Sequence, residues 1–258
     1  MGAVRRAVLA LVTAGLVAGC SGPLTEPEAR PSLFVEEAEV SAAARAAYGP
    51  AAGEAYEELA AFVLDESLVL DLLDPAGDQV GAEDLNEGIV GRLAPGSRPV
   101  WEARVAAALA GDVEAQGDVK VLRLYDLQVP EGVGLAPGDP VRSQVVTGAF
   151  VDVGEEPGEM VATTAPAGDG ASTTAPPTLP LTVSLRHEAV LELRGRGGTS
   201  DVEVERDLSF DVVPGPPETD GPSWLIQSYE GDVRLTHGSE ELPLTDQDAT
   251  TSTVSGTG

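Results

Sequence analysis

Few side chains in this sequence could do acid–base or nucleophilic chemistry, because it contains only two histidines and one cysteine. His187 alternates with apolar residues, and burial without a partner would lower the pKa of its imidazole. Such a residue could act as a general base, but a hydrogen-bonded core histidine is the simpler interpretation. His237 lies beside a polar C-terminal segment, and we expect it to be solvated. The motifs Gly-x-Ser-x-Gly and His-Glu-x-x-His are absent from the sequence.

The cysteine, Cys20, follows a segment with the features of an export signal. Arg5 and Arg6 precede an apolar run at 7–17, which as a helix would cover roughly 16 Å, about half of the ~30 Å hydrocarbon core of a bilayer. The run is too short for a permanent transmembrane helix, so residues 1–19 are typical of a signal peptide. A small buried helix fits the paired arginines and the small residues at 18–19 poorly.

Residues 16–20, Leu-Val-Ala-Gly-Cys, resemble the lipobox of bacterial lipoproteins. The resemblance implies cleavage between Gly19 and Cys20, attachment of a diacylglycerol to the Cys20 thiol, and a lipidated tether over 20–33. Two acyl chains would anchor the protein stably to the cell membrane, at its extracytoplasmic face. Cleavage and free secretion without acylation is the alternative. One lysine against fourteen arginines, with abundant Ala, Gly and Val, is typical of a GC-rich genome such as that of an actinobacterium.

The charge of the chain limits its partners. Its 258 residues carry a formal charge of −28, so we expect no nucleic-acid partner, because phosphate binding needs clustered Lys and Arg. The acidity favours solubility outside the cell and would keep the folded part away from an anionic membrane surface. We expect no metal site, because a single cysteine cannot form a Cys-rich zinc site and no Asp-x-Asp-x-Asp-Gly calcium loop is present.

The spacing of apolar residues predicts helices in the first half of the chain and strands in the second. Helices are expected at 34–47, 54–64, 83–93 and 99–110. Strands are expected at 119–129, 141–153, 181–193, 202–212 and 224–235. The first of these strands has apolar residues at both odd and even positions, which predicts a central strand covered on both faces. Turn-rich segments between the strands favour an antiparallel meander.

Helices followed by about five strands predict an α+β domain over 34–236, in which the N-terminal helices cover one face of a curved antiparallel sheet. The Thr-, Ala-, Pro- and Gly-rich segment 154–180 is typical of a flexible insertion. Residues 237–258 have too few apolar side chains to offset the entropy of ordering, which predicts a disordered acidic Ser/Thr/Gly tail.

The helix at 56–64, the helix at 101–110 and a last strand that begins Trp224-Leu225-Ile226 resemble the NTF2-like superfamily and the Mce-associated (Tim44-like) proteins of actinobacteria. This resemblance implies that the helices pack into the concavity of a cone-like sheet. The chain also resembles actinobacterial lipoproteins that enclose acyl chains between a curved sheet and helices. The many small residues on the expected helices and strands allow either a filled core or a hollow one.

The resemblances suggest which side chains would line a pocket on the concave face. The candidates are Trp101, His187, Trp224 and Tyr229, although the two tryptophans more simply anchor the core. Among NTF2-like enzymes, ketosteroid isomerases use an Asp base and a Tyr/Asp oxyanion hole. The corresponding candidates here would be Tyr56, Tyr125, Asp126, Asp207 and Tyr229, none of which lies in a recognisable motif.

We therefore expect no catalytic activity and no cofactor beyond the covalent diacylglycerol on Cys20. The expected function is that of a non-catalytic interaction or accessory module of the cell envelope, attached to the membrane and meeting an envelope protein partner. The alternative is a lipoprotein that binds a lipid or another small apolar ligand on the concave face of its sheet. An NTF2-like acid–base enzyme ranks third.

Overall fold

The computed structural model describes residues 32–73, 80–129, 132–154, 179–216 and 221–244, which all belong to one unit that begins at Pro31. The expected signal peptide, the acylation site Cys20 with the tether up to residue 31, and most of the expected insertion and tail lie outside the described residues. None of the described helices is long and apolar enough to cross a bilayer.

The described part of the chain contains seven helices, all of them in its first half. They are α1 (Ala42–Tyr48), α2 (Ala51–Asp65), α3 (Leu70–Leu73), α4 (Ala82–Asn86), α5 (Ile89–Arg92), α6 (Arg98–Leu109) and α7 (Val113–Leu122). The predicted helices at 54–64 and 99–110 are confirmed as α2 and α6. In α2 the buried side chains Tyr56, Leu59, Ala60 and Val63 follow the i, i+3, i+4, i+7 spacing of one helix face.

Eight strands of the described residues form a single mixed, open sheet. They are β1 (Ser32–Val35), β2 (Glu39–Val40), β3 (Gly134–Leu135), β4 (Val141–Val153), β5 (Leu181–Gly195), β6 (Gly198–Pro214), β7 (Trp224–His237) and β8 (Glu240–Glu241). The order is β1-β4-β5-β6-β7-β8, with β2 also on β4 and β3 on β5. The long strands pair antiparallel, as expected, whereas β1 and β2 pair parallel to β4.

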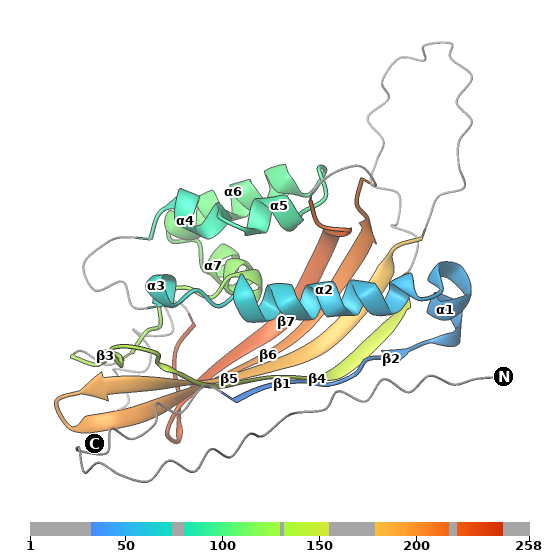
Figure 1. The fold of residues 1–258 in the computed structure, drawn as a ribbon. Coiled ribbons are helices and arrows are strands. Elements are labelled where there is room, and N and C mark those ends of the chain that lie inside the picture. The colour runs from blue at the N-terminus through green and yellow to red at the C-terminus, as the bar shows by residue number, and fades with distance from the viewer. Residues whose placement is uncertain (1–31, 74–79, 130–131, 155–178, 217–220, 245–258) are drawn as a thin grey trace, which may run out of the picture. The chain divides into compact units, whose positions relative to one another are not determined.

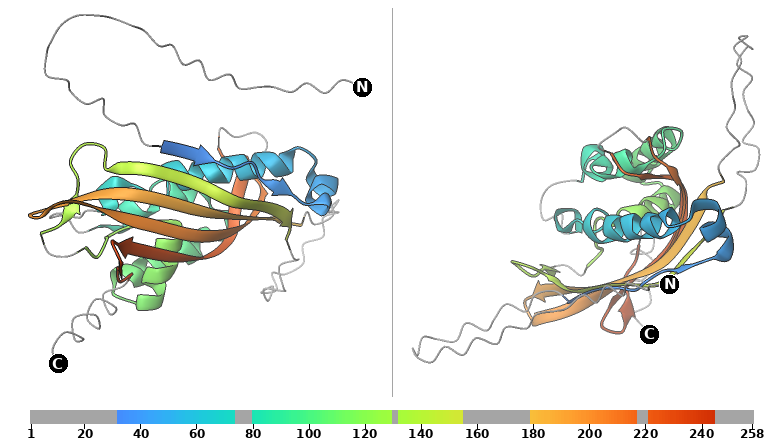
Figure 2. Two further views of the ribbon diagram at one scale, coloured as in Figure 1. Left: turned by 90° about the horizontal axis from the view of Figure 1, so that it is seen from below. Right: turned by 45° about the vertical axis from the view of Figure 1, so that its right-hand side comes forward.

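The helices lie on one side of the curved sheet, and α2 runs along its concave face (Figure 1; Figure 2, right). Burial alternates along β5, so that Leu181, Val183, Leu185 and His187 point into the core between sheet and helices. The core beneath α2 is filled by the protein's own side chains: Phe62 of α2 packs edge-on against Phe210 of β6, with ring centroids 6.4 Å apart.

The predicted central strand at 119–129 is wrong, because α7 occupies residues 113–122. Asp112 begins this helix: its carboxylate accepts a hydrogen bond from the Ala115 amide at 2.9 Å. The end of α7 is buried on nearly all sides, and even Lys120 and Val121 are buried. Apolar residues therefore occur at both odd and even positions of this segment, as in a strand that is covered on both faces. A short run that is apolar all round fits a buried helix as well as a strand, and the cap is what distinguishes them.

Two other predicted helices are shorter than expected. Residues 34–40 contain the end of β1 and the whole of β2 rather than a helix, and α1 begins only after Ser41, whose hydroxyl accepts a hydrogen bond from the Ala44 amide at 3.0 Å. The predicted helix at 83–93 is divided into α4 and α5 at Gly88, whose φ of 74° a helix does not accommodate. In both places a local polar or glycine signal overrides an Ala- or Leu-rich pattern.

The ordered chain continues past the expected start of the tail. Strand β7 includes His237, and β8 pairs with it through the partners Thr236–Glu241 and His237–Glu240. Leu242 then packs into a second apolar cluster, beside Leu235. The first eight residues of the predicted disordered tail are therefore part of the fold, because one buried leucine and two strand pairings attach them to β7.

Candidate functional site

A cleft of about 620 Å³ lies between α6 and the first half of β7, and it is the best candidate for a binding site in the described part of the chain. Its walls are the turn at 93–97, the start of α6, Asp118 of α7, and residues 227–229 of β7. Clefts of this size, lined mostly by apolar side chains with a few polar groups, are typical of small-molecule sites.

Local hydrogen bonds place the turn of the cleft against β7. The Ala94 amide donates to the Ile226 carbonyl at 2.8 Å, and the Ser97 hydroxyl donates to the Gln227 carbonyl at 2.6 Å. Pro99 follows in the first turn of α6, where the missing amide proton costs nothing. The turn and the helix start are thereby held to the strand, and the cleft remains between them.

Of the four predicted pocket residues, the structure brings two together at this cleft. Trp101 and Tyr229 both line it, with ring centroids 6.2 Å apart and in edge contact. The Trp101 indole Nε1–H donates to Asn86 Oδ1 at 2.8 Å. The Tyr229 hydroxyl is shielded from solvent and has no hydrogen-bond partner among the described residues, and burial raises the pKa of Tyr229 to about 12.

The other two predicted pocket residues lie elsewhere. Trp224 packs edge-on against Tyr48, with ring centroids 5.5 Å apart, and it does not line the cleft. His187 is fully buried under α2. Its Nδ1 accepts hydrogen bonds from Arg206 Nη2 at 2.8 Å and Arg206 Nε at 3.2 Å, so its proton is on Nε2, which donates to Gln144 Oε1 at 3.1 Å.

The environment of His187 keeps its imidazole neutral. Burial, and secondarily the Arg206 charge, lowers the pKa of His187 to about 2, and burial lowers the pKa of Arg206 to about 9. Arg206 Nη2 lies 3.4 Å from the Val63 carbonyl, whereas Nη1 has no hydrogen-bond partner among the described residues. A histidine that is neutral, buried and already accepting two hydrogen bonds is poorly suited to remove a proton from a substrate near pH 7.

The tyrosines and aspartates considered for acid–base chemistry do not meet at one site. The Tyr56 hydroxyl donates to the Glu36 carbonyl at 2.5 Å, and burial raises its pKa. Tyr125 is buried with the Lys120 ammonium 5.0 Å from its ring centroid. The Asp126 carboxylate accepts a hydrogen bond from the side-chain amide of Gln128 at 2.7 Å. Asp207 is on the outer face of the sheet, where its Oδ1 lies 3.8 Å from Arg186 Nη1.

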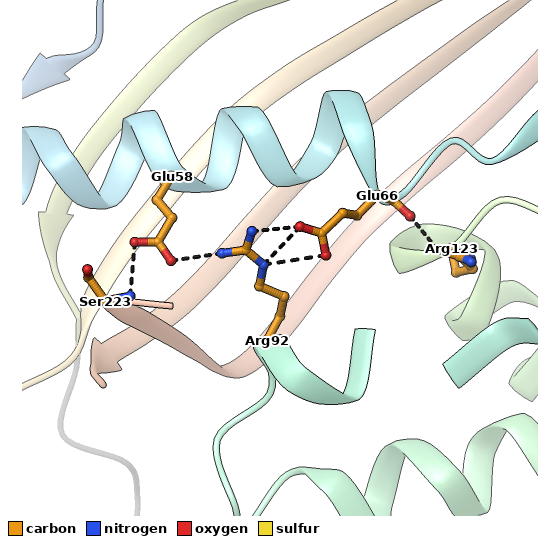
Figure 3. Close-up of polar contacts among 5 residues, drawn as sticks. All are labelled: Glu58, Glu66, Arg92, Arg123 and Ser223. Atoms are coloured by element: carbon orange, nitrogen blue, oxygen red, sulfur yellow. Dashed lines mark hydrogen bonds and ion pairs between the residues drawn. The ribbon is translucent and has the colours of Figure 1, made fainter. Parts of the chain in front are cut away.

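A polar cluster that was not predicted from the sequence joins α2, α5 and the residue before β7 (Figure 3). Arg92, at the end of α5, donates to Glu58 of α2 at 2.8 Å and to Glu66, the C-cap residue of α2, at 2.6 Å, so it bridges two carboxylates. Glu58 also accepts from the Ser223 amide at 3.2 Å. We call Glu58, Glu66 and Arg92 the arginine clamp. Its sequence signal is a pair of glutamates eight residues apart, four positions before and four positions after Phe62.

Arg123 extends these contacts from behind the clamp. Its guanidinium donates to the Glu66 carbonyl and, at 3.0 Å, to the Asp84 carbonyl, and burial lowers its pKa. It thereby holds the C-terminal end of α2 to α4.

Among the described residues no group of three or more His, Cys, Asp and Glu side chains is placed to hold a metal ion. No protein-family model, no curated protein and no solved structure matches this chain.

Proposed function

We propose that the protein is a lipid-anchored, non-catalytic accessory module at the extracytoplasmic face of a bacterial, and specifically actinobacterial, cell membrane. The observation that carries this proposal is the sequence Leu-Val-Ala-Gly-Cys at 16–20, preceded by two arginines and an apolar run. A diacylglycerol on Cys20 would hold the chain at the membrane, and the eleven residues 21–31 would separate the anchor from β1.

The folded part supports a binding role rather than a catalytic one. Its one buried histidine is neutral and hydrogen-bonded, and Asp207 faces the opposite side of the sheet from it. Three polar contacts are made at the cleft: Trp101 with Asn86, Ser97 with the β7 backbone, and Arg104 with Asp118. None of these pairs is a nucleophile beside a base.

We further propose that the domain is NTF2-like. The arrangement that supports this is the curved sheet with α2 along its concave face (Figure 1). The short parallel strands β1 and β2 at the edge of β4 depart from the expected antiparallel meander. They extend the sheet at the edge formed by β4.

Acylation of Cys20 is tested by labelling cells with an alkyne analogue of palmitate. The wild-type protein should carry the label and sediment with membranes, and Cys20→Ser should carry none and retain its signal peptide. Ser21→Ala, one residue away, keeps the thiol and should be labelled like the wild type. Unlabelled wild-type protein, or equal labelling of Cys20→Ser, would contradict the proposal.

Binding of a small apolar molecule is the second candidate function, and the cleft beside α6 favours it. The concave face under α2 is occupied by side chains such as Phe62 and Phe210, so the cleft is the better location for a ligand. Native mass spectrometry of protein released from membranes separates the two candidates. A bound molecule of a few hundred daltons supports ligand binding, whereas an associated polypeptide on an otherwise empty protein supports the accessory role.

A further inference from the structure

We propose that the cleft between α6 and β7 binds a neutral, mainly apolar small molecule that carries one amide or similar hydrogen-bonding group, and that the side chain of Gln227 recognises this group. The inference deepens the second candidate function, and it rests on the function being binding rather than catalysis. It does not depend on the lipid anchor.

Gln227 occupies an irregular position in the sheet. In the pairing of β6 with β7, Asp211 is opposite Ser228 and Val212 is opposite Ile226, so that Gln227 is opposite no residue. This is a β-bulge, a device that frequently redirects a side chain next to a binding site. The Gln227 carbonyl is engaged by Ser97, which fixes the backbone of the bulge at the cleft wall.

The side-chain amide of Gln227 is available to a ligand. It is only partly buried, it lines the cleft, and no residue in the described part of the chain hydrogen-bonds to it. A primary amide offers both a donor and an acceptor, and a ligand amide satisfies both at once. A ligand without such a group would strip water from the Gln227 amide and leave it unpaired, which weakens binding.

The remaining walls favour an uncharged, apolar body. Val100 is exposed at the start of α6 although it is apolar, and Leu93 and Val213 line the cleft with it. Two charged side chains line the cleft, Arg104 and Asp118, and they form an ion pair with each other. The cleft therefore offers no free charge to an ionic ligand, in contrast to the strongly acidic composition of the chain as a whole.

The two tryptophans provide a direct test, because Trp101 lines the cleft and Trp224 packs elsewhere. The full chain carrying Cys20→Ser, labelled with ¹⁵N, gives one indole signal for each, and Trp224→Phe assigns them. The probes are 2-naphthamide and 2-ethylnaphthalene, a hydrocarbon of similar shape. We expect 2-naphthamide to shift the Trp101 signal and to leave the Trp224 signal in place. No shift of the Trp101 signal, or equal shifts of both signals, would overturn the proposal.

Variants then test the role of Gln227. Gln227→Leu should weaken 2-naphthamide roughly tenfold and leave the affinity for 2-ethylnaphthalene unchanged or improved. Val100→Phe should narrow the cleft and weaken both probes, whereas Leu109→Phe, also at an exposed position of α6 but away from the cleft, should weaken neither. Equal loss of both probes in Gln227→Leu, or full binding in Val100→Phe, would refute the site. Palmitate labelling of Cys20 is unaffected by either result, so a failure here leaves the accessory role standing.

Discussion

Arg206 and Arg92 are both withdrawn from solvent, but they have opposite kinds of partner. Arg206 is fully buried, and the atoms that it meets, His187 Nδ1 and the Val63 carbonyl, are neutral. The Arg92 side chain is 22% exposed and lies between the carboxylates of Glu58 and Glu66. The charge of Arg92 is thus balanced within its cluster, whereas that of Arg206 is not.

The difference indicates what each arginine contributes. Burial without a counterion lowers the pKa of Arg206 to about 9, so the charge of this residue opposes folding while its alkyl chain and hydrogen bonds fill the core. The arginine clamp, by contrast, favours folding, because its opposite charges attract each other between α2 and α5. Its partial exposure to solvent weakens that attraction. Removing each side chain should therefore give effects that differ in size and in their dependence on pH and salt.

Truncation of Arg206 should have the largest effect on stability. Arg206→Ala leaves a cavity under α2 and removes the donors to His187 and Val63, so we expect the free energy of unfolding to fall by about 3 kcal/mol in urea denaturation. Arg206→Met retains most of the volume and removes the buried charge, and should stay within about 1 kcal/mol of the wild type. Equal destabilisation by both variants would show that the hydrogen bonds of the guanidinium, and not the packing of the side chain, stabilise the core.

His187 should make the protein sensitive to acid. Its folded-state pKa, about 2, is below the ordinary 6.5, so the unfolded chain binds a proton between these values and the folded protein does not. The stability contribution is complete above pH 6.5 and is lost as the pH falls toward 2, at up to about 1.4 kcal/mol per pH unit. His187→Gln keeps an acceptor for Arg206 and does not titrate. From pH 6 to pH 4 the wild type should therefore lose about 2 kcal/mol more than this variant; parallel stability curves would contradict the assignment.

The same pair shows how far the core could be predicted from the sequence. Alternation in β5 placed His187 on the inward face, and the strict period of a strand makes such a prediction dependable. Arg206 alternates with the inward-facing Val204 and Leu208 in β6, so its burial was also predictable. Its partner was not, because the pairing of His187 with Arg206 depends on the register of β5 against β6.

The candidate cleft was predictable only in part. Trp101 and Tyr229 stood out because large aromatic residues mark cores and pockets alike, and both line the cleft. Gln227 could not be singled out, because its bulge is defined only by the pairing of β7 with β6.

The bounds 141–153 of β4 were predicted correctly, since alternation and flanking turns are local signals. Helix α7 was missed because its burial comes from tertiary contacts that remove the amphipathic pattern.

Loss of the arginine clamp should cost less than loss of Arg206. Because all three side chains remain partly exposed, Arg92→Ala should lower the free energy of unfolding by about 1 kcal/mol in low salt, and less in 1 M salt. Arg142→Ala is a matched control, because Arg142 is paired with Glu192 on the surface and is about half exposed. Its effect should be about 0.5 kcal/mol or less. A salt-independent loss in Arg92→Ala would assign the effect to packing on Phe62, whose ring centroid lies 5.9 Å from the guanidinium, instead of to charge.

The smallest effect is expected at the cleft, where a buried group has no partner to lose. The Tyr229 hydroxyl is buried without a hydrogen bond, so Tyr229→Phe should leave the free energy of unfolding unchanged or raise it by about 0.5 kcal/mol. Tyr56→Phe makes the opposite change, since its hydroxyl donates to the Glu36 carbonyl, and should cost about 1 kcal/mol. Thermal and urea denaturation of the two variants measure this contrast directly. A loss in Tyr229→Phe as large as that in Tyr56→Phe would mean that the Tyr229 hydroxyl has a hydrogen-bond partner in solution. That partner would then already occupy the part of the cleft beside Trp101 and Tyr229.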